Sequence, residues 1–165
     1  MNDILSLSLA IIALVISIAI AVRQMRGSRK AETLPALIEM LGEYRSYKSV
    51  NHRKYIAAQL RQECDPNETG YSKLPKSAAK KVYPVSYFFD NVGMLIAAGI
   101  VDENLVLGYI GESVTSCWSV LEPYILRERE IRGGDFQVYF EHLAVKARKN
   151  PPSQIRRKYK LEKNS

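Results

Sequence analysis

The chain has 165 residues and a formal net charge of +7, from 24 lysines and arginines against 17 aspartates and glutamates. Its two cysteines, Cys64 and Cys117, are too few for a disulfide framework and lack the spacing of a CxxC metal knuckle. After an apolar N-terminal stretch and its basic flank, about 130 residues remain, enough for one compact domain but not for two.

The N-terminal stretch from Ile4 to Val22 contains no charge, proline or glycine. As a helix with a rise of ~1.5 Å per residue it reaches about 28 Å, close to the hydrocarbon thickness of a bilayer. A cleaved signal peptide fits less well, because residues 1–3 carry no basic side chain and the apolar core is too long. The stretch therefore predicts a transmembrane helix over residues 4–22.

Flanking charge predicts the orientation of this span. A basic juxtamembrane linker over residues 23–31 follows it and holds Arg23, Arg26, Arg29 and Lys30. Because positive flanks stay cytoplasmic, we expect a single-pass inner-membrane protein with residues 1–3 outside and the C-terminal domain in the cytoplasm. The same four side chains are candidate contacts for anionic lipid head groups.

Small residues recur along one face of the predicted span, at Ala13, Ser17 and Ala21. Small residues at four-residue spacing let two membrane helices approach closely, so the span is a candidate for homo-oligomerisation. Alanine and serine are also common in membrane helices without any partner, and this alternative is the favoured explanation of the pattern.

Helical periodicity, with no long alternation of period two, predicts an all-α domain over residues 32–150. Its first half is expected to hold a helix capped at Thr33, a second over residues 49–64 and a third from Pro84 to Gly99. Between the last two, we expect a loop over residues 65–75 and a weak helical turn over residues 77–82. Gly99 is predicted to end its helix in a left-handed conformation.

The second half is expected to hold three helices. Asp102 is predicted to cap a short one that ends at Gly111, and Ser113 to open a longer one to about Arg132, kinked at Pro123. Asp135 is predicted to cap the last helix. Residues 151–165 are then expected to form a disordered basic tail.

That tail carries the excess charge, because the chain from Lys146 onward holds eight basic side chains and one acid. The tail has three readings: contact with anionic lipid, contact with nucleic acid through phosphates, or a solvated appendage. The lipid reading is favoured over nucleic acid, because the predicted anchor confines the tail near a membrane. Its candidate lipid-contacting residues are Arg156, Arg157, Lys158 and Lys160.

No catalytic, cofactor-binding or metal-ligating constellation is recognisable. The only histidines, His52 and His142, have no second ligand at helical spacing on a shared face. Asp90 follows two phenylalanines and is a candidate for binding a basic group of a protein partner, or simply a solvated position. A set of aromatic residues is expected to form the core: Phe88, Phe89, Trp118, Phe136, Tyr139 and Phe140.

The segment from Pro84 to Arg129 resembles a bacterial family classed as domain of unknown function 4760. The resemblance lies in a Phe-Phe-acid triplet, a later glycine, aliphatic and acid, and a tryptophan followed by Pro-aromatic-Ile. Here these are Phe88, Phe89 and Asp90, then Gly99, Val101 and Asp102, then Trp118, Pro123, Tyr124 and Ile125. Asp90 departs from the usual glutamate. The resemblance implies a small helical protein, often with one N-terminal membrane helix, and no established reaction.

Together these patterns predict a membrane-anchored helical interaction module with an unknown protein partner, without enzymatic activity and without a cofactor. The alternative is a membrane-acting effector or toxin of a bacterial stress or phage-defence system.

Overall fold

The structure is a computed structural model that describes residues 13–14, 16–17, 20, 35 and 37–159. The chain divides into two units, residues 1–41 and residues 42–165. In the first unit every described residue is helical. No helix within the described part of the chain is long and apolar enough to cross a membrane. Most of the predicted span from Ile4 to Val22, and the whole linker over residues 23–31, lie outside the described residues.

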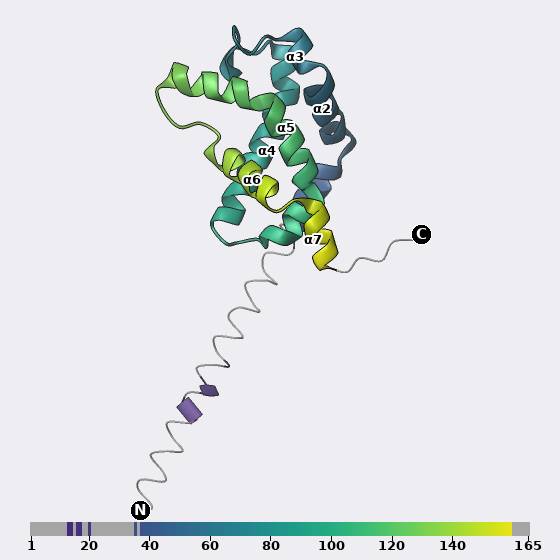
Figure 1. The fold of residues 1–165 in the computed structure, drawn as a ribbon, viewed down its shortest axis with the longest axis vertical. Helices are drawn as coiled ribbons and strands as arrows, with labels where there is room; N and C mark the ends of the chain where they lie inside the picture. Colours follow the sequence, from purple (N-terminus) through teal and green to yellow (C-terminus); the bar gives the residue numbers. More distant parts are fainter. Residues whose placement is uncertain (1–12, 15, 18–19, 21–34, 36, 160–165) are drawn as a thin grey trace, which may run out of the picture. The chain divides into compact units, whose positions relative to one another are not determined.

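The second unit is all-helical, which confirms the predicted fold class, and residues 37–159 contain no strand. Figure 1 shows its elements, which are α2 (Tyr47–Ala58), α3 (Leu60–Glu63), the 3-10 turn η1 (Tyr71–Lys73), α4 (Lys76–Ala97), α5 (Glu103–Arg132), α6 (Val138–Lys149) and α7 (Pro152–Lys158). Helix α6 packs against both long helices, α4 and α5. Helix α2 covers another side of the same pair, and α7 lies against α5.

Aromatic rings fill the centre of this unit. Trp118 is only 1% exposed, and its ring meets that of Phe140 edge-on with centroids 5.0 Å apart. Phe140 stacks in turn on Phe89 at 5.1 Å, which joins α5, α6 and α4. The aromatic core is therefore confirmed, except that Tyr139 is 41% exposed and Phe136 is half-buried.

Helix α4 is longer than predicted, because it begins at Lys76 and continues through Pro84. Proline at this position removes a hydrogen bond to the carbonyl of Lys80. The helix persists because Ala78 and Val82, before the proline, are fully buried on the same face as Val85. Burial of these first turns of α4 outweighs one lost backbone hydrogen bond.

Helix α5 is one continuous helix and not the predicted pair, because Gly111 does not end a helix. A Cβ atom at Gly111 would lie 2.9 Å from Cγ of Pro152, so the glycine permits the close approach of α7. Asp102 does cap α5, as predicted, and accepts a hydrogen bond from the Leu105 amide at 2.8 Å. Gly99 has a φ of 67°, which confirms its predicted left-handed conformation.

Pro123 lies inside α5 and leaves the Ser119 carbonyl without its helical donor. Arg61 supplies a substitute, since its Nη2 donates to that oxygen at 2.6 Å. Figure 1 shows α5 changing direction along its length, in agreement with the predicted kink. The freed carbonyl thus becomes an attachment point for the end of α3.

The tail is more ordered than predicted. Residues 152–158 form α7, in which Pro152 and Ile155 are buried, and Ile155 packs beside Gly108 of α5. Arg156 pairs with Glu112 at 2.5 Å, although both side chains are exposed. The composition of the segment is that of a solvated tail, but Pro152 and Ile155 are buried against glycines of α5 and order it. Residues 160–165 lie outside the described part.

Candidate functional site

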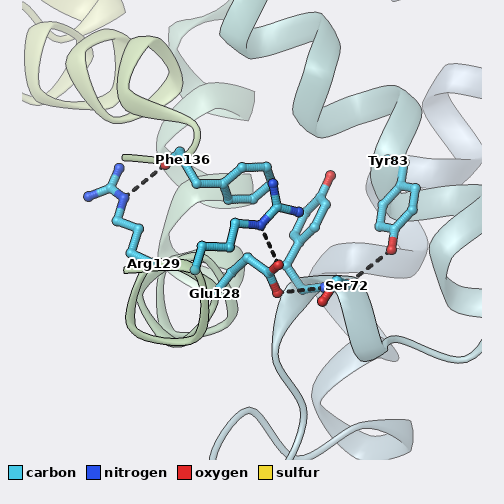
Figure 2. Close-up of polar contacts among 7 residues, drawn as sticks. Ser72, Tyr83, Glu128, Arg129 and Phe136 are labelled. Carbon is cyan, nitrogen blue, oxygen red and sulfur yellow. Dashed lines mark hydrogen bonds and ion pairs between the residues drawn. The ribbon is translucent and has the colours of Figure 1, made fainter. Parts of the chain in front are cut away.

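The first candidate site is a buried carboxylate, Glu128, which is 1% exposed and faces η1 from α5. Its Oε2 accepts a hydrogen bond from the Ser72 amide at 2.8 Å, and its Oε1 accepts one from Arg132 Nε at 2.5 Å (Figure 2). Burial alone would raise the pKa of Glu128. The donors Ser72 and Arg132 outweigh that effect, so the pKa lies below its ordinary value.

The surrounding contacts tie three separate segments to α5 (Figure 2). Tyr83 of α4 donates to the Tyr71 carbonyl at 3.1 Å, and Arg129 Nε donates to the Phe136 carbonyl at 2.8 Å. The Arg132 guanidinium lies 4.4 Å above the Phe136 ring. These hydrogen bonds join η1, α4 and the segment before α6, so the network stabilises the packing of this end of the domain.

Four buried polar atoms near this end of the fold have no hydrogen-bond partner among the described residues: Tyr71 Oη, Ser86 Oγ, Arg129 Nη2 and Gln137 Oε1. Burial raises the pKa of the Tyr71 phenol far above neutrality, and the nearby Ser86 hydroxyl offsets this only in part. The Tyr71 phenol is therefore neutral at pH 7.

A second candidate site is a hollow of about 390 Å³ between α2 and α4. Its lining is rich in hydrogen-bond donors and contains no carboxylate: Asn51, His52, Lys54, Tyr55, Ala58, Gln59 and Lys81. The Lys81 ammonium lies 3.7 Å from the centre of the Tyr55 ring, a cation–π contact that holds it at the edge of the hollow. Burial, together with Lys48 and Lys81, lowers the pKa of His52.

Basic charge is concentrated around this hollow. Residues 47–84 hold eight lysines and arginines against three acids. Lys76 and Lys80 line a further open hollow of about 420 Å³ beside Tyr83. The excess charge still belongs to the tail, because the rest of the chain holds as many acidic as basic side chains. Within that balanced part, six lysines and arginines lie on α2 and in the first turns of α4, so basic charge is concentrated there locally.

Comparison with known proteins identifies the family. A family model described as Domain of unknown function (DUF4760) matches residues 9–147.

The chain belongs to the DUF4760 family.

The match confirms the resemblance and extends far beyond the segment from Pro84 to Arg129. Among curated proteins and solved structures, none is similar enough to this chain to count as a match.

In this DUF4760 protein, the acid of the Phe-Phe-acid triplet has a clear structural partner. Asp90 Oδ1 accepts a hydrogen bond from the Phe140 amide at 2.9 Å, in the first turn of α6. The prediction that Asp135 caps this helix is wrong. Helix α6 begins at Val138, and the residue at its N-cap is Gln137, whose φ is 56°. A carboxylate from α4 thus caps α6 from a distance. That Asp90 binds a partner stays a prediction.

The other predicted residues are dispersed in the DUF4760 fold. The candidate lipid-contacting side chains Arg156, Arg157 and Lys158 are exposed on α7, whereas Lys160, Arg23, Arg26, Arg29 and Lys30 lie outside the described residues. Within the described part, no three His, Cys, Asp or Glu side chains could hold a metal ion. Both cysteines are buried, and burial raises the pKa of Cys117 to about 12.

Sequence reasoning missed Glu128 and the hollow of α2 and α4. The signal for Glu128 was Arg132, four residues later and on the same helix face. For the hollow it was the adjacent pair Lys80 and Lys81, which follows Lys76 in the first part of α4. Neither signal is specific without the packing of α2 or η1 against the long helices.

We predict that Glu128→Gln lowers the free energy of unfolding by about 1–3 kcal/mol at neutral pH, because Arg132 and the Ser72 amide lose a charged acceptor. The folded pKa is depressed, so this contribution is present above the unfolded value of about 4.3 and is lost as the pH falls through the lower folded pKa. Denaturant unfolding of the full chain in neutral detergent, at pH 7 and at acidic pH, measures the effect. The exposed Glu130→Gln is the matched control, and equal losses for both variants contradict the prediction.

Proposed function

We propose that this DUF4760 protein is a single-pass membrane-anchored helical interaction module, held in the inner membrane by residues 4–22 with its helical domain in the cytoplasm. The observation that carries this proposal is the uncharged stretch from Ile4 to Val22 followed by four basic residues in the linker. The family match begins at residue 9, so residues 9–22 of that stretch lie within the matched region.

A non-catalytic role is supported by the state of the polar side chains in the described domain. Glu128, the most buried acid, accepts hydrogen bonds from the Ser72 amide and from Arg132. Asp90 accepts one from the Phe140 amide of α6. The buried thiol of Cys117 has a raised pKa and is a poor nucleophile at neutral pH. The surface instead offers basic, donor-rich hollows suited to binding.

Two arginine substitutions in the proposed span test whether it anchors the chain in the membrane. We predict that Leu14→Arg combined with Ile16→Arg moves the full chain from the membrane pellet to the soluble fraction, since each arginine at a span centre costs about 2.5–3.5 kcal/mol of insertion. Leu14→Ala combined with Ile16→Ala is the matched control and should stay in the pellet. A wild-type chain that is extracted from membranes by alkaline carbonate contradicts the anchor.

Orientation and role need separate measurements. A fluorescent protein fused after Ser165 should be fluorescent and a periplasmic alkaline phosphatase fused there should be inactive, and the reverse pattern contradicts the cytoplasmic placement.

Expression of the wild type and of the double arginine variant distinguishes the interaction module from a membrane-acting effector. Loss of membrane potential on overproduction of the wild type, but not of the arginine variant, overturns the module in favour of the effector.

A further inference from the structure

We propose that the hollow between α2 and α4 is a binding site for a phosphate-bearing anion, gripped by Lys54 and Lys81 with His52 at its wall. This site goes beyond the proposed membrane module and does not depend on the anchor. The chemistry is that of a phosphate monoester or diester group, whether carried by a soluble compound or by a lipid head group.

The lining is the first argument. The hollow has side-chain donors on several sides, from the amides of Asn51 and Gln59 and from the ammonium groups of Lys54 and Lys81, and none of its lining residues is a carboxylate. Glu63 of α3 is not among the lining residues, and its carboxylate accepts a hydrogen bond from the Tyr55 hydroxyl at 2.5 Å. A site with donors and cations but no acid favours an anion over a cation or an apolar ligand.

The placement of the cations is the second argument. Lys81 is held over the Tyr55 ring, so part of its side-chain entropy is already lost before a ligand arrives. Burial is the main cause that lowers the pKa of His52, and the charges of Lys48 and Lys81 lower it further, which places both ammonium groups near the imidazole. In the described part of the chain, none of the three nearby lysines, Lys48, Lys54 and Lys81, forms an ion pair. Like charges that lie close together repel one another, and an anion that binds between them reduces this repulsion.

Size is the third argument. A volume of about 390 Å³ accommodates a phosphate group together with part of its carrier. The hollow is open to solvent, so its ligand does not have to be small. Tyr55 supplies an apolar wall beside the charged groups, and burial together with Glu63 raises the pKa of its phenol, which therefore stays neutral.

The experiment follows the two histidines of the full chain in neutral detergent by NMR, because His52 lines the hollow and His142 lies on α6 as an internal reference. Inorganic phosphate is titrated to about 20 mM at constant ionic strength, a range that detects millimolar affinity. Binding neutralises the field of Lys48 and Lys81, so the pKa of His52 shifts upward while the His142 signals stay fixed. Equal movement of both histidines, or none, overturns the proposal.

Matched variants assign the effect to the hollow. Lys54→Gln combined with Lys81→Gln keeps helix-forming side chains of similar length and should weaken phosphate binding about tenfold or more. Lys149→Gln combined with Lys158→Gln removes the same charge from α6 and α7 and should leave binding unchanged. Equal weakening by both pairs shows a general charge effect and overturns the site. Retained amide-signal dispersion confirms that each variant is folded.

The source of the phosphate group is distinguished by reconstituting the chain in nanodiscs. Phosphatidylcholine discs are compared with discs that also contain phosphatidylglycerol, in the absence of free phosphate. A His52 shift that requires the anionic lipid identifies a head group, while a shift seen only with inorganic phosphate identifies a soluble ligand. Both results support the proposal, and the absence of both overturns it.

Discussion

Trp118→Ala is expected to lower the free energy of unfolding by about 3–5 kcal/mol. The indole is buried in α5, where it meets Phe140 of α6 edge-on, and that ring in turn stacks on Phe89 of α4. Truncation leaves a cavity at the junction of three helices. Helices α4, α5 and α6 pack against one another, so none of them can move into the cavity without losing its other packing contacts.

This loss is measured by denaturant unfolding of the full chain in neutral detergent. Far-UV circular dichroism is the signal, because the variant removes the only tryptophan of the chain. Leu126→Ala is the matched control on the same helix, since Leu126 is 44% exposed, and it should cost less than about 1 kcal/mol. A loss below about 1 kcal/mol for Trp118→Ala would show that the ring contributes little to the core.

Gly93→Ala is expected to cost about 3 kcal/mol or more, although it adds one methyl group. A Cβ atom at Gly93 would collide with the Tyr139 carbonyl oxygen of the backbone near the start of α6. Because a backbone carbonyl cannot rotate out of the way as a side chain can, α6 must move off α4. The movement also strains the hydrogen bond from the Phe140 amide to Asp90.

Two readouts separate this clash from a general helix effect. Amide hydrogen exchange at Phe140 should accelerate together with the loss in stability, because its acceptor is displaced. Gly42→Ala is the matched control: Gly42 is also helical, but a Cβ there meets nothing within 4 Å. That substitution should stabilise by about 0.5–1 kcal/mol. Unchanged stability and exchange in Gly93→Ala would contradict the close approach.

Local signals in the sequence determined which segments are helical and how some of them end. Three of these signals are the Asp102 cap, the left-handed Gly99 and the apolar face around Phe89. Each depends on residues within one or two turns of one another, so it can be predicted from the sequence. The burial of Trp118 follows from the same periodicity. The family resemblance was also readable in the sequence, since it rests on packing and capping residues.

Tertiary structure decided where local signals conflict with burial. Gly111 and Pro84 read as helix ends because each weakens a helix by itself, but packing of α5 against α7 and burial of the first turns of α4 outweigh that cost. The same holds for α7, whose two buried apolar residues hold a basic segment that composition describes as solvated. The Asp90 cap of α6 and the basic hollow join residues from different helices. They exist only after α4 has packed on α6 and on α2, since no short-range pattern encodes such a distance.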